Sequence, residues 1–166
     1  MLFFAWKPGV ASSEEPKFSE YEVKAAFILN ALKFVDFPKG VTAGLSVCVL
    51  GDNPFGKDLD ALSGKTVRDK VLTVKNIRSI SEAKECSVVF ICRSERERLG
   101  EILGGLSASR PFTMGDTEGF GERGVVLNFY QEAERIRFQI NLEAAKKSGL
   151  SFDARLLKLA TIVAAK

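Results

Sequence analysis

Three short apolar runs separated by helical segments constrain the fold of this chain most strongly. The runs cover residues 45–50, 71–74 and 87–92, and each is rich in valine, leucine or isoleucine. Runs of this length and composition are typical of strands that are buried on both faces of a parallel sheet. The alternation of strands with helices therefore predicts an α/β fold in which at least these strands are parallel.

The helical segments have recognisable beginnings and ends. The first helix is expected over residues 20–35, because Phe37 precedes Pro38 and the residue before a proline avoids the helical conformation. Ser94 and Glu97 have the spacing of a capping box, which predicts that Ser94 begins a helix. The later helices of the first half are expected over residues 55–62, 79–84 and 94–106.

The second half of the chain changes to antiparallel pairing. A brief strand over residues 112–114 is followed by a loop, residues 115–124, that contains four glycines. Residues 125–130 and 135–140 are expected to form a hairpin, because apolar and polar residues alternate in its second strand. Asn141 and Asp153 are expected to cap the last two helices.

These elements predict a single-domain α/β sandwich over residues 19–166, in which helices flank a mixed, mostly parallel sheet of about six strands. The first half has a Rossmann-like order and the second half an antiparallel hairpin. Residues 1–18 combine an apolar start with small residues at positions 9–12. They are expected to be either a flexible tail or the remnant of a signal peptide.

Composition argues against several classes of function. The 24 basic and 21 acidic residues are interspersed, so no nucleic-acid partner is expected. The chain has no run of about 18 apolar residues, so we expect no direct insertion into a membrane. It also has no histidine, which excludes Ser-His-Asp and Cys-His relays and weakens any zinc site. We therefore expect no enzyme activity, no cofactor and no metal.

The stretch from Gly51 to Lys57 matches the beginning of a phosphate-binding loop, but the match does not support nucleotide hydrolysis. Asp58 occupies the position of the hydroxyl residue that would reach magnesium, and Pro54 removes a backbone N–H. The turn nevertheless follows a parallel strand, where α/β proteins often bind small molecules. An alternative ligand site would use Gly51, Asn53, Phe55, Arg93 and Ser94.

The glycine-containing loop also carries three carboxylates, Asp116, Glu118 and Glu122. An EF-hand needs its calcium ligands at fixed positions of a 12-residue loop, and that spacing is not present. We therefore expect a solvated loop and not a calcium site.

Cysteine placement leaves two alternatives open. Cys48 lies within the first predicted strand and Cys86 at the beginning of the third, and these strands would be neighbours in a doubly wound order. The pair could form a disulfide in an oxidising compartment, or both could be buried thiols in a reducing one. Cys92 is unpaired in either case.

The first helix has more apolar residues than the single stripe of a surface helix needs. It is either enclosed in the core, or it covers the sheet on one side and meets another chain on the other. The second alternative predicts an association surface near this helix and the loop that follows residue 115. The residues proposed for partner contact are Phe27, Leu32, Phe34, Phe55, Asp116 and Phe120.

Several motifs occur in the order and spacing of a known family. They are YEVKAAFILN at residues 21–30, KFVDFP at 33–38, CVLGDNPFG at 48–56, CSVVFI at 86–91, GD at 115–116 with GF at 119–120, RFQINLEAA at 137–145 and LLKLA at 156–160. Over residues 20–163 the chain resembles the YfiR-like family of periplasmic regulators.

This resemblance implies an exported, non-catalytic α/β protein that forms homodimers. Better-known members bind the periplasmic portion of a membrane-bound diguanylate cyclase and hold it inactive, which lowers cyclic di-GMP and biofilm formation. The second function considered is a periplasmic sensor or solute-binding domain that accepts a small-molecule ligand.

The resemblance also favours a disulfide, because Cys48 and Cys86 lie where family members have a cysteine pair. Well-known members have further cysteines downstream, whereas none follows Cys92 here. Redox control of repression is therefore not implied for this chain.

Overall fold

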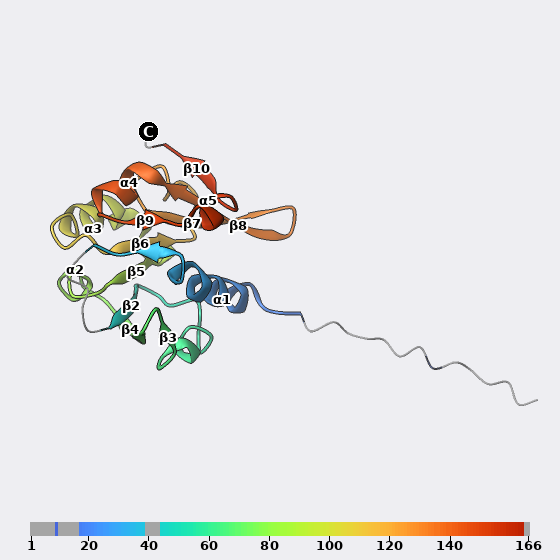
Figure 1. Ribbon diagram of the computed structural model, residues 1–166. Coiled ribbons are helices and arrows are strands. Elements are labelled where there is room, and N and C mark those ends of the chain that lie inside the picture. The colour runs from blue at the N-terminus through green and yellow to red at the C-terminus, as the bar shows by residue number, and fades with distance from the viewer. Residues whose placement is uncertain (1–8, 10–16, 39–43, 165–166) are drawn as a thin grey trace, which may run out of the picture.

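The described part of the chain forms one eight-stranded sheet with helices on both faces (Figure 1). The computed structural model describes Gly9 and residues 17–38 and 44–164, so the expectations for residues 1–8 and 10–16 lie outside the described residues. In spatial order the strands are β10 (Thr161–Val163), β8 (Arg135–Asn141), β7 (Leu127–Glu132), β6 (Phe112–Gly115), β5 (Val88–Ile91), β2 (Leu45–Leu50), β4 (Lys70–Ile77) and β3 (Thr66–Val67).

Most neighbouring strands pair in parallel. β2 lies between β4 and β5, and the parallel arrangement continues through β6 to β7. β7 and β8 form the expected antiparallel hairpin, and β10 adds to β8 in parallel. Every residue of β5 and β6 is buried, as expected for strands covered on both faces. The predicted α/β class and mostly parallel sheet are confirmed, and short strands at both edges widen the sheet.

Helix α1 (Glu20–Leu32) covers one face of the sheet. Ser19 begins it with a capping box, because its side chain accepts a hydrogen bond from the Glu22 N–H while the Glu22 carboxylate accepts one from the Ser19 N–H. Ile28 and Leu32 are fully buried and belong to the same apolar cluster as Phe90 of β5. The helix is therefore held by local capping and by burial against the sheet.

The other face is covered by α2 (Ile80–Ala83) and α3 (Leu99–Gly105). Leu99 and Ile102 are fully buried in a second cluster that also contains Ile91. Because Phe90 and Ile91 are consecutive, their side chains point to opposite faces and join the two clusters through one strand.

Two of the helices predicted between residues 55 and 106 differ from the structure. The segment expected to begin at Ser94 forms a 3-10 helix, η2 (Arg93–Arg98), and α3 follows it. Ser94 does not cap it; its Oγ accepts a hydrogen bond from the Asp52 N–H at 2.9 Å, across the carboxyl ends of β2 and β5. The helix expected over residues 55–62 is limited to the 3-10 helix η1 (Asp60–Leu62).

Of the two helices predicted in the C-terminal region, one is confirmed and the other is shorter than expected. Asn141 caps α4 (Leu142–Lys147) by accepting a hydrogen bond from the Ala144 N–H at 2.9 Å, as expected. The helix after Asp153 ends early, because α5 (Ala154–Leu157) has only four residues and the chain then pairs with the open edge of β8. Tyr130 and Thr161 share a hydrogen bond of 2.8 Å that supports this pairing.

The first helix ends before residue 35 because the chain there enters a small second sheet. In it β1 (Val35–Asp36) pairs antiparallel with β9 (Ser151–Phe152). Arg68, in the turn between β3 and β4, donates hydrogen bonds to the Val35 carbonyl and to the Asp36 carboxylate. These contacts hold the chain after α1 against β9 and against the turn between β3 and β4.

Cys48 and Cys86 form a disulfide, with their Cα atoms 6.1 Å apart. Cys48 lies in β2 and Cys86 precedes β5, the parallel neighbour of β2. The expected adjacency of the two strands is confirmed, and it is what brings the two cysteines within bridging distance.

We predict that reducing this disulfide lowers the free energy of unfolding by about 4 kcal/mol, because the bridge closes a 38-residue separation. Urea unfolding of oxidised and reduced protein measures the difference. Thiol counting after denaturation without reductant should find Cys92 as the one reactive thiol. Three reactive thiols in protein made in an oxidising compartment would contradict the prediction.

Candidate functional site

A buried ion pair joins α1 to the loop after β6. Lys24 is 3% exposed, and its Nζ lies 2.9 Å from Asp116 Oδ2. Lys24 also pairs with Glu20, one helical turn earlier. Asp116 directly follows β6, so its carboxylate lies at the carboxyl edge of the sheet. Because an unpaired buried charge is costly, removing either partner would destabilise the contact between α1 and this loop.

Tyr21 completes this group of polar side chains. Its hydroxyl donates a hydrogen bond of 2.8 Å to Asp116 Oδ2, and Lys24 Nζ lies 4.5 Å from the centroid of its ring. Burial, followed by the hydrogen bond to Asp116 and the negative charges of Asp116 and Glu20, raises the pKa of Tyr21 well above its ordinary value. The phenol therefore stays protonated and acts as a donor. We call Glu20, Tyr21, Lys24 and Asp116 the polar cluster.

A cavity of about 540 Å³ lies beside the polar cluster. Its walls come from the first turns of α1, from the loop after β6 and from β7 and β8. The cavity lies beyond the carboxyl end of β6, which is the edge where open α/β sheets commonly bind ligands. Four carboxylates and one ammonium group line it, namely Glu20, Asp116, Glu118, Glu122 and Lys24. We call it the acidic cavity.

Two residues that line the acidic cavity carry buried acceptor atoms without a partner in the described structure. Asn128 is 2% exposed; its Nδ2 donates to the Thr117 carbonyl at 2.9 Å, but its Oδ1 accepts no hydrogen bond. Glu122 Oε2 is also buried without a hydrogen bond. Buried acceptors usually have a donor, so these two atoms are exceptions within the described structure.

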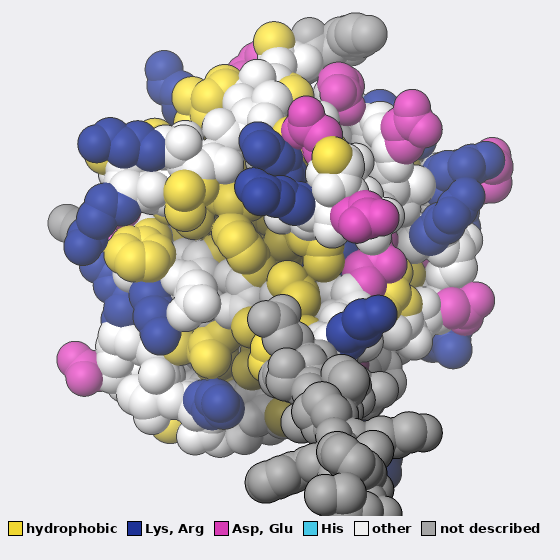
Figure 2. Space-filling model, turned by 90° about the vertical axis from the view of Figure 1, so that its right-hand side faces the viewer, with side chains coloured by type: hydrophobic (Ala, Val, Ile, Leu, Met, Phe, Trp, Pro, Cys, Tyr) yellow, Lys and Arg dark blue, Asp and Glu magenta, His cyan; other side chains and the backbone are white. Residues whose placement is uncertain are grey.

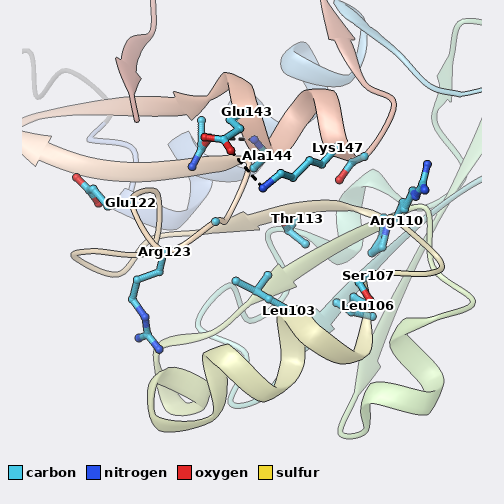
Figure 3. A pocket seen from close by; sticks show the side chains of 14 residues that line it. Leu103, Leu106, Ser107, Arg110, Thr113, Glu122, Arg123, Glu143, Ala144 and Lys147 are labelled. Carbon is cyan, nitrogen blue, oxygen red and sulfur yellow. Dashed lines mark hydrogen bonds and ion pairs between the residues drawn. The ribbon is translucent and has the colours of Figure 1, made fainter. Parts of the chain in front are cut away.

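A second cavity, of about 330 Å³, lies between α3 and α4 (Figure 3). Leu103 and Leu106 supply apolar walls, and the Lys147 ammonium pairs with Glu143 at 3.2 Å at the margin. Figure 3 shows the carboxylate of Glu122 directed away from this cavity.

Apolar side chains are accessible around α1 and the β10 edge. Phe27 is half-buried, and its ring lies 4.7 Å from that of Phe138 in β8. Phe34 is also half-buried, with the Arg155 guanidinium 5.0 Å from its ring centroid. Leu159 and Ile162 are 69% and 49% exposed. We call Phe27, Phe34, Leu159 and Ile162 the C-terminal apolar surface.

Figure 2 shows hydrophobic side chains gathered near the middle of one face of the molecule, with Lys, Arg, Asp and Glu side chains around them. An apolar centre with a charged margin is the usual anatomy of a protein–protein interface.

The residues proposed for partner contact differ in how far their side chains are exposed. Leu32, Phe55 and Phe120 are buried in the core, so their side chains offer no contact surface. Asp116 is held in the polar cluster, with a side chain that is 6% exposed. Phe27 and Phe34 are partly accessible, and their role in partner contact stays a prediction.

The residues of the alternative ligand site lie near one another at the carboxyl ends of β2 and β5, where Gly51 and Ser94 approach closely. Gly51 has φ +108°, and a Cβ there would lie 2.5 Å from Ser94 Oγ. Asn53 Oδ1 accepts a hydrogen bond from the Phe55 N–H, and Arg93 is exposed. Neither of the two cavities described above is lined by these residues.

Residues that the sequence analysis did not single out shape the acidic cavity. Lys24 stands in an otherwise apolar stretch of α1, and Asn128 stands inside a buried strand. A charged or amide side chain at a position that the pattern assigns to the core is the signal that could have identified both.

Cys92 is the free thiol of the chain, and it is buried. Burial, followed by the nearby negative charges of Asp116 and Glu95, raises the pKa of Cys92 to about 12. The thiol is therefore protonated and unreactive. Within the described residues, no three Cys, Asp or Glu side chains gather closely enough to hold a metal ion.

The fold and the site define a small α/β domain with a ligand-sized cavity at the carboxyl edge of its sheet. A family model described as YfiR/HmsC-like matches residues 21–161, which is most of the chain. The protein belongs to the YfiR/HmsC-like family.

Solved structures share the fold at low sequence identity. A conserved domain protein from Vibrio cholerae O1 biovar El Tor is 14% identical, with a TM-score of 0.62 over 90% of this chain. A substrate binding protein with adhesive properties from Clostridium difficile, in its ligand-free open form, is 11% identical, with a TM-score of 0.58 over 87% of this chain. A domain from Streptococcus pneumoniae in complex with L-Trp is 9% identical, with a TM-score of 0.52 over 72% of this chain.

The chain spans 61%, 60% and 55% of the lengths of these three proteins, respectively. No curated protein matches the sequence. None of the helices in the described residues is both long enough and apolar enough to cross a membrane.

We predict that Lys24→Met lowers the free energy of unfolding by about 3–5 kcal/mol, because it leaves Asp116 as an uncompensated buried charge. Lys147→Met is the matched control. It breaks an exposed pair with Glu143 and should cost less than about 1 kcal/mol. Urea unfolding compares the two, and equal losses would contradict a stabilising role for the buried pair.

Proposed function

We propose that this protein is a periplasmic regulatory binding protein that represses a membrane-bound diguanylate cyclase by occupying its periplasmic portion. Such repression lowers cyclic di-GMP and biofilm formation. The observation that carries the proposal is the family match over residues 21–161, because the family is regulatory and not catalytic. We also propose that the chain forms a homodimer, and sedimentation of the purified chain measures its oligomeric state.

The disulfide supports the proposed location in the periplasm. Structural disulfides persist in oxidising environments such as the bacterial periplasm and are rare in the cytosol. Cys48 is fully buried and Cys86 is 9% exposed, so the bridge is part of the core between β2 and β5.

The C-terminal apolar surface supports contact with another protein. Ile162 of β10 is in register with Ile140 of β8, so both side chains point to the face of the sheet that α1 covers. In the described sheet β10 has a neighbour on one side only. Its open edge presents backbone N–H and C=O groups that an extended segment of a partner can pair with.

The acidic cavity supports a second candidate function, a small-ligand sensor of a signalling system. Its volume lies within the range of about 300–1,000 Å³ that is typical of small-molecule sites. The two functions are compatible, because a repressor whose affinity for its partner depends on a ligand performs both.

We predict that deleting the gene raises cellular cyclic di-GMP, and that the wild-type chain restores the lower level. Leu159→Asp and Ile162→Asp should fail to restore it, because each places a charge on the C-terminal apolar surface. Both side chains are exposed, so folding should change by less than about 0.5 kcal/mol. Mass spectrometry of nucleotide extracts measures cyclic di-GMP.

Val71→Asp is the matched control, because Val71 is 51% exposed and lies on β4 near the other edge of the sheet. It should restore the lower level of cyclic di-GMP. An unchanged level after deletion would refute repression. Restoration by Leu159→Asp and Ile162→Asp would refute the proposed contact surface.

A further inference from the structure

We propose that β10 is the docking edge for an extended segment of the repressed partner, and that this segment has uncharged, strand-forming residues between acidic ones. The segment pairs with β10 and extends the sheet by one strand. The inference rests on the proposed function, since the segment belongs to the protein that this chain represses. It goes beyond that function in naming how the partner binds and which chemistry its segment has.

The two edges of the described sheet differ in how they are protected. β3 has two residues and is flanked by Lys65 and Arg68, and a short edge strand with charged neighbours resists pairing with other chains. β10 lies in a stretch without charge or proline, residues 159–164. Figure 1 shows the two strands at opposite ends of the sheet. Of these two edges, β3 is blunted by charge and β10 is not.

The uncharged stretch around β10 is accessible. Leu159 is 69% exposed and Ile162 is 49% exposed, and Thr161 between them is exposed as well. Thr161, Ile162 and Val163 are all β-branched, which favours an extended conformation. An accessible edge of this composition aggregates readily unless another chain covers it. The edge is therefore suited to pairing with a strand from a partner.

The unpaired charges beside this edge are positive. Lys33 and Lys158 each directly precede a residue of the C-terminal apolar surface, and neither has an ion pair with a described residue. Asp153, in contrast, is paired with Arg155 at 3.0 Å. A segment with acidic residues at its ends would complement the two lysines, while its uncharged centre pairs with β10.

The same charges favour a different protein over a second copy of this chain. In a symmetric dimer each copy contributes the same surface to the interface. Two copies that met through β10 would bring Lys33 and Lys158 of both copies into one interface, and like charges oppose such pairing. The homodimer proposed above therefore uses another face.

Fluorescence anisotropy of a labelled peptide tests the proposal on the purified, disulfide-bonded chain. The probe is the peptide EETVTITVEE. Main-chain hydrogen bonds supply the affinity in strand addition, so the probe needs the stated chemistry and not the partner's own sequence. We expect saturable binding with a Kd below about 1 mM.

Two control peptides separate strand pairing from charge. KKTVTITVKK should bind about tenfold more weakly, because it meets the two lysines with like charge. EETVPPTVEE keeps the acidic ends, but its two consecutive prolines remove N–H groups from both edges of the strand, so it should not bind.

Lys158→Glu tests the position of the site. The side chain is exposed, and its reversal should weaken binding of EETVTITVEE about tenfold and strengthen binding of KKTVTITVKK. Lys84→Glu is the matched control, because it makes the same change in net charge at the end of α2, on the other face of the sheet. It should leave both affinities unchanged. Urea unfolding confirms that both variants are folded.

The proposal is overturned by the absence of saturable binding at about 2 mM EETVTITVEE, by equal affinity for the acidic and basic peptides, or by equal affinity of the wild-type and Lys158→Glu proteins. A dimer that becomes a monomer on Ile162→Asp substitution would also overturn it, because a second copy would then occupy the edge. Cyclic di-GMP that stays unchanged on gene deletion refutes repression without affecting peptide binding, so the two failures are distinguishable.

Discussion

The buried pair of Lys24 and Asp116 is the interaction on which the arrangement of the site depends. It joins the first helix to the carboxyl end of β6, and Tyr21 adds a hydrogen bond to the same carboxylate oxygen. Removing either partner would leave the other as an unpaired charge on a largely buried side chain. The pair therefore links the first turns of α1 to the loop after β6, and these two segments form adjoining walls of the acidic cavity.

The same helix connects the cavity to the surface proposed for partner contact. Glu20 and Lys24 line the cavity, and Phe27 follows less than one turn later and packs against Phe138 of β8. A ligand that changes the position of α1 would also change how Phe27 and Phe34 are presented. Such a connection is a physical basis for regulation, because a ligand shifts partner affinity when it contacts the two states differently.

Much of the fold could be predicted from the sequence because its central strands carry a strong signal. The runs that became β2 and β5 are apolar throughout, and burial on both faces requires that composition. The edges carry no comparable signal. β10 has three residues, and the turn residues Arg68 and Asp69 of the β3–β4 hairpin have positive φ without the Asn-Gly pair that usually marks such a turn.

The candidate site was harder to predict because it depends on contacts between distant segments. Lys24 and Asp116 are 92 positions apart, and nothing local to either residue indicates the other. Phenylalanines such as Phe55 and Phe120 could not be assigned to surface or core from composition alone, since burial depends on how the loops that carry them close over the sheet. The sequence motifs identified the family, whereas the polar cluster and the acidic cavity required the three-dimensional structure.

The central claim is that this chain acts by occupying another protein. Its most direct test is to add the purified, disulfide-bonded chain to membranes that contain the cyclase and to measure cyclic di-GMP synthesis against chain concentration. The account predicts inhibition that saturates when the added chain reaches the amount of cyclase in the membranes. Synthesis that stays unchanged at a large excess of folded chain would contradict it.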